Sequence, residues 1–197
     1  MATHQLHEKW YLASIYFFLH FQYNGWFFFA CMGLLTFKLE KLGISKIKLK
    51  QIYRFFVFAC VPAYCLSILW INIPTPLYLL VNFSSIVQLI GWTWLIKILY
   101  ENKKSIAETL SPLTRTLFIL AAIANTIKVL LQAGSTHPTL SQIAFGFRPI
   151  VIGYLHLVLL GATTIFLIAF SISEKIILVT RQIRLGIIIF VNGIIIN

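Results

Sequence analysis

The fold is decided by residues 149–171, which read PIVIGYLHLVLLGATTIFLIAFS and contain no Asp, Glu, Lys or Arg. A helix of this length can cross the hydrocarbon core of a bilayer, which is roughly 30 Å thick. The apolar residues do not alternate with period two, as they would in a strand of a membrane barrel. Because a backbone in lipid must satisfy its own hydrogen bonds, the run predicts a transmembrane α-helix.

The whole chain has the composition of a membrane protein. Of its 197 residues, 59% are hydrophobic and 11% are charged, whereas soluble domains carry about 25% charged residues. A soluble domain could not cover its surface with so few charges. We therefore predict an all-α polytopic transmembrane helix bundle that forms a single membrane domain over residues 1–197.

Similar apolar runs recur along the chain and predict about six spans. They cover residues 10–37, 55–71, 77–100, 116–133, 149–171 and 185–196. Pro62 predicts a kink in the second run. The last run is shorter than the roughly 20 residues that a span needs. We expect either a truncated chain, such as half of a longer protein, or an intact short protein that ends in a tilted or re-entrant helix.

Positive charge follows the alternation of the predicted loops. The loops after the first, third and fifth runs, with their flanks, hold 13 of the 16 Lys and Arg residues, and the longest of them covers residues 38–54. Since Lys and Arg mark cytoplasmic loops, the N-terminus is predicted outside, in a bacterial cytoplasmic membrane. We therefore interpret the net charge of +11 as a consequence of the Lys- and Arg-rich cytoplasmic loops. The expected partner is the lipid bilayer, and no nucleic acid is predicted.

Two histidines lie inside predicted spans. Tyr16, His20 and Asn24 are spaced four apart and share one helix face, with His20 roughly 15 Å deep at a rise of 1.5 Å per residue. By the same rise, His156 is roughly 12 Å deep. Matching depth is a condition for holding one haem, or one copper or iron ion, between the first and fifth spans, since neutral imidazole is the ligand.

Three interpretations of His20 and His156 stay open. They are ligands of a haem or metal ion in a respiratory redox or sensing role, or interhelical hydrogen-bonding residues in a non-catalytic scaffold or accessory subunit. In the third interpretation, they line a proton or small-solute pathway together with Asn24 and Lys128, which requires a water-filled cavity. The other histidines are expected to be solvated: His4, His7 and His137.

Two cations are predicted near the outer membrane surface. Asn125, Lys128 and Gln132 share one face of the fourth run, and Lys128 should lie at the level of Arg148. Together Lys128 and Arg148 could hold an anionic group, such as a lipid phosphate or a haem propionate; the alternative is that they anchor helix ends. The remaining polar or small residues in the spans are interpreted as packing positions: Cys31, Cys60, Cys65, Ser85, Gln88, Trp92, Gly153 and Gly161.

No catalytic residue is identified. The sequence contains no Walker loop, G-x-S-x-G or H-E-x-x-H motif. All five acidic residues lie near predicted span ends or in loops, so no paired carboxylates stand inside the membrane for hydrolysis or ion coupling. This distribution counts against a cation-coupled transporter.

Two segments resemble a known family: residues 11–29, YLASIYFFLHFQYNGWFFF, and residues 148–161, RPIVIGYLHLVLLG. They are similar to uncharacterised membrane proteins of about twelve spans from Bacteroidetes-type bacteria, which are distantly similar to haem-copper oxidase subunit I. The N-terminal half of that family carries a run of the form HAHSH…GW, which this sequence lacks. The resemblance implies a C-terminal half with half of a metal site, completed by a missing N-terminal half or another membrane subunit.

Overall fold

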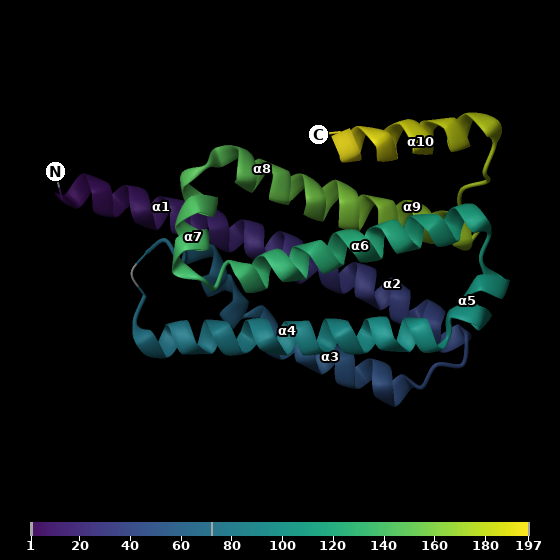
Figure 1. The fold of residues 1–197 in the computed structure, drawn as a ribbon, viewed down its shortest axis with the longest axis horizontal. Coiled ribbons are helices and arrows are strands. Elements are labelled where there is room, and N and C mark those ends of the chain that lie inside the picture. Colours follow the sequence, from purple (N-terminus) through teal and green to yellow (C-terminus); the bar gives the residue numbers. More distant parts are fainter. Residues whose placement is uncertain (1, 72, 197) are drawn as a thin grey trace.

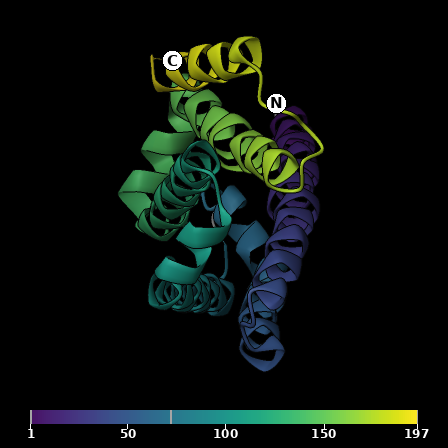
Figure 2. The same ribbon diagram turned by 90° about the vertical axis from the view of Figure 1, so that its right-hand side faces the viewer.

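The computed structural model describes residues 2–71 and 73–196, apart from the side chains of residues 2–8 and 146. His4 and His7, predicted to be solvated, therefore lie outside the described side chains, while His137 is exposed as predicted. The described residues form helices and turns without a strand, which confirms the all-α fold. The long helices run side by side along one axis, as the side view and the turned view show (Figures 1 and 2).

The chain begins with one long helical segment. It consists of α1 (Ala2–His20), the π-helical stretch η1 (Phe21–Phe27) and α2 (Phe28–Lys41). The segment ends where Gly43 adopts a φ of 81°, a left-handed conformation that favours glycine. The Ile44 N–H then donates to the Leu39 carbonyl at 3.1 Å, so the last turn of α2 is closed by backbone hydrogen bonds.

The predicted basic loop over residues 38–54 is largely helical instead. Helix α3 (Lys46–Cys60) includes most of it, because residues 46–60 contain no Gly or Pro and its Lys, Leu and Gln residues favour a helix. The kink predicted at Pro62 is confirmed, since α3 and the 3₁₀ stretch η2 (Pro62–Ile68) meet at a bend of 45°. Proline causes the bend because it lacks the N–H that the helix needs.

The central part of the chain forms four helices: α4 (Thr75–Glu101), α5 (Lys103–Thr109), α6 (Pro112–Gly134) and α7 (Pro138–Gly146). The Trp92 indole on α4 donates to the Thr126 hydroxyl on α6 at 3.0 Å. Ser85, Gln88 and Trp92 are all buried, which agrees with their predicted role in packing.

The last part of the chain forms α8 (Arg148–His156), a second π-helical stretch η3 (Leu157–Thr164), α9 (Ile165–Ser173) and α10 (Arg181–Ile196). In η3, the hydroxyls of Thr163 and Thr164 donate to carbonyls five residues back, at 3.0 and 2.8 Å. A Cβ added to Gly161 would lie 3.3 Å from the Ala124 Cβ, so glycine permits the close approach of α6. Gly153 has no such neighbour.

Three helical segments are long and apolar enough to cross a membrane: α4, α6 and the continuous segment Arg148–Ser173. The bent pair of α3 and η2 raises the number to four if it counts as one span. The first helix, which carries His20 and Asn24 in its middle, is not in this set, and α10 has 16 residues. The described residues therefore provide three to four candidate membrane-spanning helices.

Loops predicted to lie on the same side of the membrane meet in the structure. The Lys38 ammonium at the end of α2 contacts the Glu174 carboxylate after α9 at 2.8 Å. At the other end of the bundle, the Tyr78 hydroxyl donates to the Thr136 carbonyl at 2.8 Å. These contacts agree with the alternation of loops that the charge pattern predicts.

Candidate functional site

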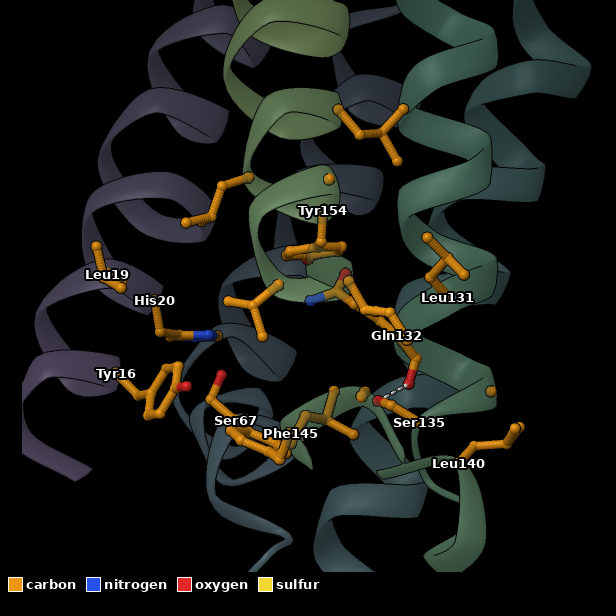
Figure 3. A pocket seen from close by; sticks show the side chains of 18 of the residues that line it. Tyr16, Leu19, His20, Ser67, Leu131, Gln132, Ser135, Leu140, Phe145 and Tyr154 are labelled. Carbon is orange, nitrogen blue, oxygen red and sulfur yellow. Dashed lines mark hydrogen bonds between the residues drawn. The ribbon is translucent and has the colours of Figure 1, made fainter. Parts of the chain in front are cut away.

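A cavity of about 420 Å³ lies at the Thr136 end of the bundle, between α1, η1, η2, α6, α7 and α8. We call it the outer cavity. Its size falls within the range of small-molecule sites, about 300–1,000 Å³. The wall is mostly apolar. Its polar side chains are those of Tyr16, His20, Tyr23, Asn24, Ser67, Gln132, Ser135 and Tyr154; Figure 3 labels Tyr16, His20, Ser67, Gln132, Ser135 and Tyr154 among them.

His20 is 3% exposed and is fixed in one tautomer. Its Nε2 lies 2.9 Å from the Cys60 carbonyl, and because a carbonyl oxygen only accepts, Nε2 must carry the hydrogen. Nδ1 of the neutral ring is then an acceptor, and the Asn24 amide nitrogen donates to it at 3.3 Å. The prediction that His20 and Asn24 share a helix face is therefore confirmed. The hydrogen bond from His20 also joins the first helix to Cys60 at the end of α3.

The bend at Pro62 makes the Cys60 carbonyl available to His20. In an α-helix, this carbonyl would accept from the N–H of Tyr64, four residues on. Here the Tyr64 N–H donates to the Val61 carbonyl at 3.1 Å instead, as in a 3₁₀-helix. One proline thus changes the local backbone and releases an acceptor that the histidine uses.

The Asn24 amide has an orientation that follows from His20. One N–H donates to the imidazole, and the amide also interacts with the Tyr154 hydroxyl on α8. Its Oδ1 is buried and has no hydrogen-bond partner among the described residues. A buried acceptor without a partner costs about 1–3 kcal/mol. This oxygen is therefore a candidate to accept a hydrogen bond from an O–H or N–H group of a ligand.

Gln132 presents a second such oxygen from α6. The residue is 8% exposed, lines the outer cavity, and its Oε1 is buried without a partner in the part of the chain that the structure describes. Figure 3 shows the side chain extending from α6 towards Tyr154. Asn24 and Gln132, which lie on different helices, thus both line the cavity, and each carries a buried oxygen without a partner among the described residues.

Aromatic rings close one part of the wall. Tyr16 meets Phe145 of α7 edge to face, with ring centroids 5.1 Å apart, and Phe145 also packs against Trp70 at 5.7 Å. Tyr16, a predicted cofactor-binding residue, therefore lines the cavity next to His20 (Figure 3). Such a wall suits the apolar part of a ligand.

The two predicted cations are not brought together. Lys128 is 4% exposed and its ammonium lies 4.8 Å from the centre of the Phe28 ring, while Arg148 is exposed at the start of α8. Neither residue lines the outer cavity. Within the described residues, Lys128 has no carboxylate partner; the ion pairs there involve other lysines, near helix ends.

The two predicted haem or metal ligands are placed differently. His20 lines the outer cavity; His156 is half-buried with contacts of its own and does not line it. A ligating nitrogen needs a free lone pair, so ligation by His20 would require one of its hydrogen bonds to be replaced. The described residues contain no group of three or more His, Cys, Asp or Glu that could hold a metal ion. The joint ligand role of His20 and His156 therefore stays a prediction.

The π-helical stretches are features that the sequence did not predict. η1 begins directly after His20, and η3 begins directly after His156, so both candidate histidines precede a π-helix. Such stretches are rare and frequently occur at functional sites. The hydroxyl bonds of Thr163 and Thr164 stabilise η3, but hydropathy and spacing do not distinguish a π-turn from an α-turn.

Comparisons with protein-family models, with curated proteins and with solved structures gave no match for this chain. The resemblance to the twelve-span family therefore stays a prediction, and the residues of the outer cavity are what indicates a function.

Proposed function

We propose that this protein is an integral membrane protein that binds a small lipophilic molecule carrying O–H or N–H donors in the outer cavity. One observation carries the proposal: Asn24 and Gln132 line the cavity, and the buried side-chain oxygen of each has no hydrogen-bond partner among the described residues. A ligand with donors would satisfy both acceptors. Its role would be that of a carrier or sensor for this molecule.

The apolar wall supports a ligand that partitions into lipid. Polar groups in a small-molecule site fix orientation, whereas the apolar wall provides most of the contact area. The Tyr154 hydroxyl, next to the Asn24 amide, can complete the polar set. No charged side chain lines the outer cavity, which favours a neutral ligand over an ion.

This proposal differs from the proton or solute pathway considered from the sequence. His20 and Asn24 line the outer cavity, but Lys128 and His156, the other predicted members of the pathway, do not. A binding site therefore accounts for the geometry better than a continuous polar path. His20 has a positioning role, because it orients the Asn24 amide.

The proposed topology has six spans, with the N-terminus outside and the Lys38–Glu174 end of the bundle in the cytoplasm of a bacterial cell. The distribution of Lys and Arg supports this orientation. Cysteines introduced at exposed Ser105 and Thr139 test it in intact cells. A membrane-impermeant thiol reagent should label Thr139→Cys and leave Ser105→Cys unlabelled; the reverse pattern would contradict the orientation.

The binding proposal is tested with a panel of lipophilic alcohols, each paired with its methyl ether. Detergent-purified protein should bind the alcohols roughly 5–10-fold more tightly than the ethers, since one hydrogen bond contributes about 1 kcal/mol or more. Gln132→Leu and Asn24→Leu should each reduce this difference. Equal affinities within the pairs, or no binding by any member, would refute the proposal.

The haem or metal interpretation stays a prediction with its own measurement. A reduced-minus-oxidised visible spectrum and metal analysis on the same purified sample test it directly. A signal lost in both His20→Ala and His156→Ala would support the ligand roles. A protein without haem or transition metal would leave the hydrogen-bonding role of His20 as its explanation.

A further inference from the structure

A second cavity, of about 560 Å³, lies at the Lys38 end of the bundle, between α2, α4, α5, α6 and α9. We call it the basic-end cavity. Its interior is mostly apolar. The Trp92 indole that lines it is already hydrogen-bonded to Thr126, and the amide of Asn125 donates to the Ala121 carbonyl. Three cations line the mouth of this cavity, which we call its rim: Lys38, Lys103 and Arg115.

The depth of the basic-end cavity matches one leaflet of a bilayer. On α6, the lining extends from Arg115 to Thr126, which is roughly 16 Å at a rise of 1.5 Å per residue. On α2, it extends from Phe28 to Leu39, or roughly 16 Å by the same rise. Both lengths are about half of the hydrocarbon core, which is roughly 30 Å thick.

The charges at the mouth of this cavity are unequal. Lys38 is paired with Glu174 at 2.8 Å, so its charge is neutralised. Lys103 lies 4.0 Å from the centre of the Tyr100 ring, and Arg115 has no acidic partner within the described residues. Lys103 and Arg115 therefore supply positive charge that an anionic group could neutralise.

We propose that the basic-end cavity binds an anionic phospholipid from the adjacent leaflet. One acyl chain occupies the apolar interior as far as Trp92, and the phosphate lies between Lys103 and Arg115. Basic pockets between transmembrane helices recognise anionic headgroups, and Arg and Lys both bind phosphate well. The match of length, apolar lining and rim charge identifies a lipid better than a free anion, which would not fill the interior.

Tryptophan fluorescence can detect this lipid directly. Trp92 lines the basic-end cavity and is 7% exposed, so lipid outside the cavity has little access to it. The sample is a variant that keeps Trp92 and carries Phe at the other four tryptophan positions. This variant is reconstituted into phosphatidylcholine vesicles. Phosphatidylglycerol or phosphatidylcholine, brominated near the end of the acyl chain, is then titrated in as a quencher.

We expect phosphatidylglycerol to quench Trp92 at a lower mole fraction than phosphatidylcholine. One cation near a lipid headgroup contributes about fivefold in affinity, so Lys103→Gln with Arg115→Gln should largely remove the preference. Lys104→Gln is the matched control, since Lys104 is exposed and does not line the cavity. Circular dichroism and the thermal midpoint confirm that each variant is folded.

Two results would overturn the proposal. The first is equal quenching by the two lipids, or a preference for phosphatidylglycerol that is as large in the Lys103→Gln/Arg115→Gln double variant as in the Lys104→Gln control. The second is relief of quenching by millimolar inorganic phosphate, because the site would then recognise a free anion. The alcohol-binding test of the outer cavity uses different residues, so the two proposals can fail independently.

Discussion

The two cavities differ in where their polar groups lie. In the outer cavity, the lining residues Asn24 and Gln132 each carry a buried oxygen without a partner, and no charged side chain of the described residues lines the wall. In the basic-end cavity, the interior indole of Trp92 is satisfied and the charges of Lys103 and Arg115 lie at the rim. Interior acceptors select a ligand by its donors, whereas rim charges select it by its headgroup.

The largest effect is expected from His20→Ala, which removes the residue that organises the outer cavity. The Cys60 carbonyl and the Asn24 amide would both lose their partner, and a void would remain. We expect a loss of about 2–4 kcal/mol in unfolding free energy, measured by denaturation in detergent. His137→Ala is the control, since His137 is exposed. A variant as stable as wild type would contradict the hydrogen bonds assigned to His20.

Gln132→Leu should act in the opposite direction on the ligand-free protein. It removes an unpartnered oxygen and keeps an apolar side chain of similar size, so stability should rise by about 1–3 kcal/mol. The gain would be accompanied by weaker alcohol binding. Gln142→Leu, at an exposed position, should change neither property. A destabilised Gln132→Leu would mean that the oxygen has a partner in the ligand-free state.

Lys128→Met tests a buried cation that belongs to neither cavity wall. Its ammonium is stabilised by the Phe28 ring, an interaction of about 0.5–2 kcal/mol, but lacks a carboxylate partner in the described chain. Replacing a poorly compensated buried charge with an apolar residue is often stabilising. We expect a gain of about 1 kcal/mol, measured as for His20, with Lys104→Met as the exposed control. A large loss would indicate an undetected anionic partner.

The sequence predicted features that depend on local pattern. Helical fold, the kink at Pro62, the shared face of His20 and Asn24, and the same-side pairing of loops all follow from spacing, hydropathy and charge. The hydrogen bond from His20 to the Cys60 carbonyl could not be predicted. It requires that the Tyr64 N–H donate to the Val61 carbonyl instead of the Cys60 carbonyl.

Tertiary placement explains the remaining differences. Spacing gave similar depths for His20 and His156, but depth does not fix the direction of a helix face, and only His20 lines the outer cavity. The spacing predicts that Gln132 shares a face with Lys128, but whether its oxygen finds a partner depends on the side chains of neighbouring helices. The basic-end cavity combines residues of five helices, so no single segment of the sequence indicated it.

The smallest effect concerns the ion pair beside the basic-end cavity. The hydrogen bond from Lys38, together with the charges of Lys38 and Lys41, lowers the pKa of Glu174 below its ordinary value. Because the folded-state pKa is the lower one, the pair stabilises the protein above the ordinary glutamate pKa of about 4.3. This stabilisation is lost as pH falls through the lowered pKa.

Glu174→Gln should therefore lower the thermal midpoint slightly at pH 7 and make no difference once the wild-type carboxylate is protonated. The Lys38–Glu174 pair is partly buried and lies near the surface, where ion pairs contribute about 1 kcal/mol or less. The shift should therefore be small and should shrink at high salt. Glu108→Gln, at an exposed position, is the control. If the two variants respond alike at every pH, the Lys38–Glu174 contact does not hold α2 to α9. The neutralisation of Lys38 at the rim would then also need revision, since Lys38 would be free to bind the lipid phosphate.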